Sequence, residues 1–158
     1  MGTNFYIKRR LSQKRKNELI KYIQTDQYDE VLEELPKSIH LGKRSYGWKF
    51  LWDANDFKYF KPTKDSFERF LKSGLIFDEY GRQFSYEKFI EDEVGKSLDQ
   101  GYDAESYYKD HPDESNNEYW AYRKYTIDHF RNHFGLKVNN RGEFYIGTYR
   151  FTVLTDFS

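Results

Sequence analysis

The stretch "HLGKRSYGWKF", residues 40–50, decides how the middle of the chain folds. It joins two runs rich in β-forming residues, "SIHLGKR" and "YGWKFLWD", which meet around Arg44, Ser45 and Tyr46. Gly42 and Gly47 allow a bend or a bulge in these runs. Two β-rich runs that meet at a short connection predict a β-hairpin.

Three large rings follow each other at every second position of this stretch. A strand would place Trp48, Phe50 and Trp52 on one side, and we expect that side to face the core. An alternative is an exposed platform on which nucleic-acid bases stack, with Lys43 and Arg44 beside it. The need of the core for aromatic rings argues against the platform.

The glycine-lysine pair at 42–43 also occurs in phosphate-binding loops of nucleotide-binding proteins. Such a loop needs a glycine five residues earlier and a hydroxyl directly after the lysine. Lys37 and Arg44 occupy these two places, so we do not predict a nucleotide-binding loop.

The composition indicates a core made mainly of aromatic side chains. The 158 residues include 20% aromatic and 33% charged residues, the charges cancel to a formal net charge of zero, and there is no cysteine. The chain therefore has no disulfide, thiol nucleophile or cysteine zinc site. It also has no run of 18 apolar residues and no cleavable signal, so we expect a soluble cytoplasmic protein.

The order of the expected elements predicts one α+β domain that spans residues 1–158. We expect an antiparallel sheet, built from the hairpin and a C-terminal meander, with helices packed mainly on one face. Strands are expected at 3–9, 75–78, 82–85 and in the tail 136–158, and helices at 13–24, 26–36, 66–73, 86–97 and 119–135.

The N-terminal region is basic. Its charges follow the first strand and continue along the first helix, where Glu18 is the single acid. They form either a solvated face or a patch that binds nucleic acid or an acidic partner. The candidate nucleic-acid-binding residues are Lys8, Arg9, Arg10, Lys14, Arg15, Lys16 and Lys21.

Residues 91–118 contain ten acids and two bases, together with several tyrosines. We interpret the part at about 95–118 as an acidic, Tyr-rich insertion in the domain. Carboxylates can occupy a basic groove of a partner while tyrosine rings supply contact area. The candidate partner-binding residues are Asp103, Glu105, Tyr107, Tyr108, Asp110, Asp113 and Glu114.

Catalytic and metal-binding patterns are weak. His129 and His133 lie four residues apart on an expected helix, but a third ligand is missing and Phe130 stands where a metalloprotease has glutamate. His40 and His111 are expected to be ordinary polar residues. We therefore predict no metal, no cofactor and no catalytic residue. A third hypothesis is a metal-dependent enzyme that uses His129 and His133.

Four segments resemble a family of small, uncharacterised bacteriophage and prophage proteins that begin Met-Gly-Thr-Asn-aromatic. They are "MGTNFY" at 1–6, "HLGKRSYGWKF" at 40–50, "DEYGRQFSYEKF" at 78–89 and "DFS" at 156–158. Many members of that family carry a Cys-x-x-Cys pair before the histidine of the middle motif, which implies a zinc site. Residues 24–39 contain no cysteine, so we expect that zinc site to be lost here and a helix to replace it.

The resemblance implies a phage accessory protein, and such proteins commonly bind and block host enzymes. The first hypothesis is therefore a protein without enzymatic activity that inhibits a host protein, plausibly a CRISPR effector or another defence nuclease. The alternative is a nucleic-acid-binding protein that uses the basic N-terminal region.

Overall fold

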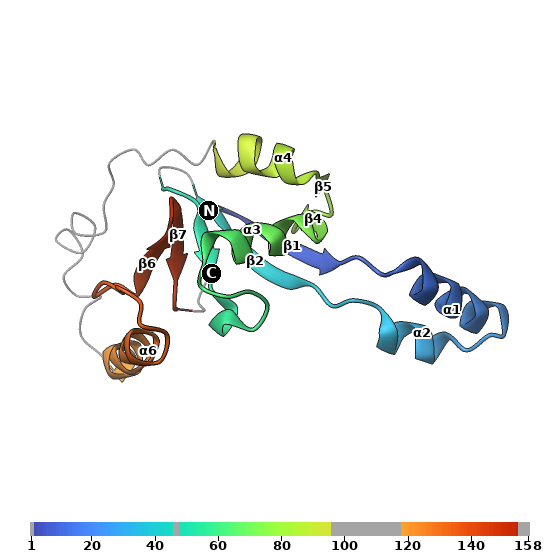
Figure 1. The fold of residues 1–158 in the computed structure, drawn as a ribbon, viewed down its shortest axis with the longest axis horizontal. Coiled ribbons are helices and arrows are strands. Elements are labelled where there is room, and N and C mark those ends of the chain that lie inside the picture. Colours follow the sequence, from blue (N-terminus) through green and yellow to red (C-terminus); the bar gives the residue numbers. More distant parts are fainter. Residues whose placement is uncertain (1, 46–47, 96–117, 155–158) are drawn as a thin grey trace.

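The computed structural model describes residues 2–45, 48–95 and 118–154, without the side chains of 118–122. Within these residues seven strands form one sheet in the order β5-β4-β1-β2-β3-β7-β6 (Figure 1). Neighbouring strands are antiparallel except β3 and β7, which are parallel. The strands are β1 (Gly2–Arg9), β2 (Ile39–Ser45), β3 (Leu51–Asp53), β4 (Gly74–Asp78), β5 (Gln83–Phe84), β6 (Glu143–Ile146) and β7 (Tyr149–Thr152).

Two helices, α1 (Gln13–Gln24) and α2 (Tyr28–Glu34), form an antiparallel pair between β1 and β2. Figure 1 shows this pair extending away from the sheet, and we call residues 13–35 the arm. The other helical elements are the 3₁₀ turn η1 (Asn55–Phe57), α3 (Lys64–Lys72), α4 (Tyr86–Lys88) with the π-helical turn η2 (Phe89–Val94), and α6 (Glu118–Phe134).

A row of aromatic side chains crosses one face of the sheet. Phe5, Trp52, Phe151 and Phe144 hold corresponding positions on β1, β3, β7 and β6, and each is at most 2% exposed. On β2 the corresponding position is Gly42. A larger residue would not fit there, because a Cβ would lie 2.3 Å from the Leu51 carbonyl oxygen and 2.7 Å from the Phe50 ring. The glycine thus makes room for an extra ring in the core.

Helices cover the face that carries this row. Phe67 of α3 packs edge-on against Trp52 with ring centroids 4.9 Å apart, and Phe89 of η2 lies 5.2 Å from Phe5. Phe130 of α6 contacts Phe144 at the other end of the row, at 6.4 Å. The α+β fold, with its mostly antiparallel sheet and with α3, η2 and α6 on one face, is therefore confirmed, whereas α1 and α2 extend away from the sheet.

The middle hairpin is confirmed, although one of its three rings lies elsewhere. Gly42 pairs with Trp52 and Lys43 with Leu51 in β2 and β3. Trp48 precedes β3 and is only half-buried, with its ring 5.8 Å from the guanidinium of Arg150. Trp48 is therefore not one of the alternating core positions, because it lies three residues before the first residue of the strand, Leu51. Phe50 and Trp52 are the two rings of this stretch that face the core.

The C-terminal region forms a hairpin of β6 and β7 where we expected a longer meander. Residues 136–139 do not join the sheet. Val138 is buried, and its carbonyl accepts a 2.8 Å hydrogen bond from Arg131 Nε of α6. The Arg131 side chain thus satisfies the Val138 carbonyl, which a neighbouring strand would otherwise have to pair.

The turn between β4 and β5 is held by a buried carboxylate. The side chain of Asp78 has no exposed surface, and it accepts hydrogen bonds from the amides of Tyr80 and Arg82 at 2.9 Å and from Arg82 Nε at 2.6 Å. Burial acts to raise the pKa of Asp78, but these hydrogen bonds outweigh it and leave the pKa below its ordinary value. The ionised form is therefore the one that the turn stabilises.

Among the helices in the described part of the chain, none combines the length and the apolar character needed to cross a membrane.

Candidate nucleic-acid interface

A basic hollow of about 600 Å³ lies beside the end of β1. Three segments contribute to it: the end of β1 with the residue after it, the loop before α3, and α3 with its C-terminal cap. The lining residues are Arg9, Arg10, Tyr59, Lys61, Ser66, Arg69, Phe70 and Ser73.

An unusual backbone turn positions the loop that supplies Tyr59 and Lys61. Asn55, Asp56 and Phe57 have φ angles of 50°, 51° and 54°, although the left-handed conformation costs a residue such as Phe57 about 1–2 kcal/mol. Neighbouring groups hold the turn in place. The Asn55 amide group donates to the His40 carbonyl at 2.7 Å, and the Phe57 ring lies 4.9 Å from that of Phe134. Strain of this kind persists only where the surroundings fix it, as they do here.

The loop is then tied directly to α3. Thr63 caps this helix by accepting a hydrogen bond from the Ser66 amide at 3.3 Å. The Ser66 hydroxyl in turn accepts one from the Lys61 amide at 2.9 Å. These bonds hold the backbone of Lys61 beside the first turn of α3, and the Lys61 side chain lines the same hollow as Arg69 from the last turn.

Tyr59 orients one of the arginines. The guanidinium carbon of Arg9 lies 5.5 Å from the centre of the Tyr59 ring, and the Phe70 ring stacks on Tyr59 at 6.0 Å with an angle of 11° between the planes. The cation–π contact favours one position of the Arg9 side chain. Tyr59 thus already packs against two groups, so we assign it the positioning of Arg9 and no role in stacking on a base.

The positive charge of the hollow is uncompensated within the described residues. Arg9, Arg10, Lys61 and Arg69 supply four cations, no carboxylate from those residues lines the hollow, and none of the four has an ion pair to one of them. Arg69 uses its Nε to donate to the Asp65 carbonyl at 3.3 Å, which leaves its two terminal amino groups for a ligand. Such a cluster attracts phosphate groups, which arginine can bind with two hydrogen bonds.

The structure separates the seven basic residues that the sequence placed together. Arg9 and Arg10 line the hollow, whereas Lys8 points to the opposite face of β1 and lies 5.1 Å from the Phe77 ring. Arg15 is paired with Glu18 and with Glu34. The three lysines of this set, Lys14, Lys16 and Lys21, are exposed on the arm.

Sequence reasoning missed Lys61 and Arg69. Lys61 lies three residues before the start of α3, and Arg69 lies in the last turn of that helix, where a cation also favours the helix dipole. The signal that could have found Lys61 is the run KYFKPTK at residues 58–64, which has three lysines and no acid.

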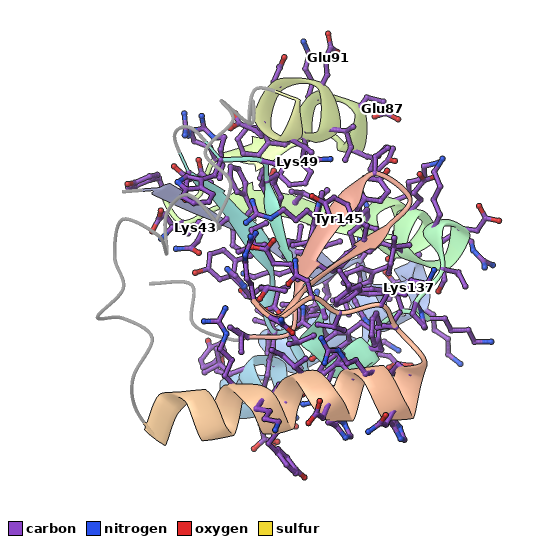
Figure 2. All side chains as sticks on the ribbon, turned by 90° about the vertical axis from the view of Figure 1, so that its left-hand side faces the viewer. Lys43, Lys49, Glu87, Glu91, Lys137 and Tyr145 are labelled. Atoms are coloured by element: carbon purple, nitrogen blue, oxygen red, sulfur yellow. The ribbon has the colours of Figure 1, made fainter. Side chains whose placement is uncertain are left out.

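The sheet face near the middle hairpin is a weaker candidate. Figure 2 shows Lys43, Lys49 and Tyr145 on this side together with Glu87 and Glu91, so both signs of charge are present. Lys49 Nζ lies 5.1 Å from the ring of Tyr145. Phe50 and Trp52 are buried and cannot stack on a base. Two of the three rings that the expected stacking platform needs are therefore not accessible.

The seven acidic and tyrosine residues proposed to bind a partner, at positions 103–114, lie outside the described residues. Their role in binding and blocking a host protein stays a prediction. His111 lies in the same segment.

Three of the histidines, His40, His129 and His133, lie within the described part of the chain and contact defined neighbours. His40 Nδ1 lies 2.9 Å from Asp53 Oδ2 and its Nε2 lies 3.0 Å from Asn4 Oδ1, so both ring nitrogens have polar partners. The rings of His129 and His133 stack 5.2 Å apart beside a hollow that Asp128 also lines. Within the described ranges, however, no three His, Cys, Asp or Glu side chains are grouped so that they could hold a metal ion.

Comparison with known proteins adds no relative: no family model, no curated protein and no solved structure matches the chain.

Proposed function

We propose that the protein binds nucleic acid through the sugar-phosphate backbone, with Arg9, Arg10, Lys61 and Arg69 as the contacts. The observation that carries this proposal is the grouping of four cations, from three separate segments, in one hollow where no described carboxylate neutralises them. Cations of this kind supply most of the affinity of proteins for nucleic-acid backbones.

The form of the site favours a polymer over a small phosphate. Its cations come from β1, from a loop and from α3, so they are spread over a wide, open surface. A polymer offers regularly spaced phosphates to such a surface. Lys14 and Lys16 of the arm, four and six residues after Arg10, are exposed and can extend the contact.

The lining also favours binding without sequence preference. Bases are read chiefly through arginine, asparagine, glutamine and acidic side chains that reach their edges. The described lining includes no asparagine, glutamine or acid, and Arg9 is held against Tyr59, so only Arg10 and Arg69 remain as arginines that could read a base. Ser66 contributes a hydroxyl group, and hydroxyl groups commonly contact phosphates, whereas Ser73 donates its hydroxyl to the Phe70 carbonyl at 2.6 Å.

Removing two cations tests the proposal. We expect the double variant R10Q/R69Q to bind labelled DNA or RNA roughly ten- to a hundredfold more weakly than the unchanged protein at about 100 mM salt, because two phosphate contacts are lost. The measurement is fluorescence anisotropy with single- and double-stranded probes.

The matched control is K124Q/K137Q, which removes two exposed cations of α6 and of the segment after it. It lowers the net charge by the same amount outside the hollow, so its affinity is expected to change less than threefold. Equal losses in the two double variants would show that net charge, and not the hollow, controls binding, and would overturn the assignment.

A further inference from the structure

The two histidines of α6 line a second hollow, which shares no lining residue with the basic hollow beside β1. It has a volume of about 390 Å³. Its lining residues are Tyr125, Asp128, His129, Asn132 and His133, and all of them belong to α6. The nucleic-acid proposal uses none of these residues, so this hollow is a separate candidate site.

The ring nitrogens of the two histidines have no polar partner among the described residues. His129 and His133 are exposed, and the contacts that they make there are ring contacts. His40 differs, because both of its nitrogens lie against Asp53 and Asn4. A neutral imidazole has one nitrogen with a free lone pair, and this is the atom that binds a metal ion. The pair on α6 therefore offers two such nitrogens.

A ring that is anchored at the core holds the two imidazoles in place. Phe134 packs edge-on against both, with ring centroids 4.6 Å from His133 and 6.0 Å from His129. Phe134 in turn lies 4.9 Å from Phe57 and packs against the hydrophobic core. Because the imidazoles are already oriented, less conformational freedom is lost when both bind one ligand.

The separation of the two imidazoles suits a single metal ion. Their centroids are 5.2 Å apart, with an angle of 11° between the planes. A tetrahedral ion that binds one nitrogen of each imidazole at about 2.0–2.1 Å holds the ring centroids about 5 Å apart. Side chains four residues apart are neighbours on a helix, so α6 itself supplies this spacing.

We propose that His129 and His133 together bind one Zn²⁺ ion. Imidazole nitrogen is a preferred ligand of zinc, whereas Mg²⁺ and Ca²⁺ prefer oxygen ligands. The two histidines fill two positions of a tetrahedral zinc ion, and water fills the others. The sequence-based expectation of no metal rested on the missing third protein ligand, and a site completed by water does not need one. Asp128 adds a carboxylate to the lining of the hollow, 3.6 Å from Arg131.

Calorimetric titration of the full chain with Zn²⁺ alone tests the proposal. We expect one ion per chain with a Kd of roughly 10 μM, since only two protein ligands contribute, and no binding of Mg²⁺ at the same concentrations. H129Q and H133Q each remove one ligand and are expected to weaken zinc binding at least tenfold, on the order of the loss that removing an outer contact already causes. Both side chains are exposed, so circular dichroism should show that the fold is retained.

Two further variants separate this site from the rest of the chain. H111Q removes a histidine from another segment, and R10Q/R69Q removes two cations of the basic hollow. Both are expected to keep the zinc affinity within about threefold of the unchanged protein, because sites that share no partners act independently. The proposal is overturned if the unchanged protein binds no zinc, if H129Q and H133Q leave the affinity as it is, or if either control loses as much affinity as they do.

Discussion

Replacing Trp52 by alanine is expected to lower the free energy of unfolding by about 3–5 kcal/mol, which for a domain of this size is a large part of its stability. Trp52 is 1% exposed and lies at the middle of the aromatic row. Its ring contacts Phe50 at 4.5 Å and Phe67 of α3 at 4.9 Å. The alanine variant would leave a cavity that these rigid rings cannot fill, so the sheet and the helical layer would both lose their main contact.

Chemical denaturation followed by circular dichroism measures this effect. The control is Tyr80→Ala, because Tyr80 is 73% exposed at the β4–β5 turn and its loss should change stability by less than about 0.5 kcal/mol. If the Trp52 variant does not fold, Trp52→Phe keeps a ring in place and is expected to cost about 1–3 kcal/mol. Stability unchanged by either substitution would contradict the position of Trp52 in the core.

The second large effect concerns the carboxylate at the β4–β5 turn. Asp78→Asn is expected to cost about 1–3 kcal/mol at pH 7, because the neutral amide loses the charge-assisted hydrogen bond with Arg82. The pKa of Asp78 is lowered in the folded protein by its hydrogen bonds, mainly those from Arg82, despite burial. Its contribution to stability is therefore present above the ordinary aspartate pKa and is lost as the pH falls through the lower, folded-state pKa.

Urea unfolding at a series of pH values between about 7 and 2 measures this dependence. The difference in stability between the unchanged protein and the Asp78→Asn variant should shrink steadily below the ordinary aspartate pKa. Glu87→Gln, a change at an exposed carboxylate of α4, serves as the control with little effect. A difference that stays constant down to the lowest pH would show that the ionised carboxylate does not stabilise the turn.

Much of the fold follows from local patterns in the sequence. The hairpin of β2 and β3 is predictable because alternating rings and a glycine mark it within fifteen residues, 39–53. The parallel pairing of β3 with β7 joins Leu51 to Arg150, about a hundred residues along the chain, and no local pattern indicates it. Pairings of this kind depend on which surfaces remain to be buried after the local elements have formed.

The candidate site is less predictable than the fold for the same reason. Arg9 and Arg10 belong to a visible basic run, whereas Lys61 and Arg69 join them only through the left-handed turn at 55–57 and the cap of α3. Asn55 and Asp56 tolerate that backbone better than most residues, but Phe57 does not, and packing against α6 holds it there. A turn stabilised by tertiary contacts leaves little trace in the sequence.

The dependence of nucleic-acid affinity on salt tests the central claim most directly. For contact between four cations and a duplex backbone, we expect the logarithm of the binding constant to fall with the logarithm of the salt concentration with a slope of roughly −3 to −4, and we expect R10Q/R69Q to reduce that slope by about 2. Absence of binding at the lowest salt concentration, or a slope that the double variant leaves unchanged, would contradict the proposal that this hollow binds the phosphate backbone.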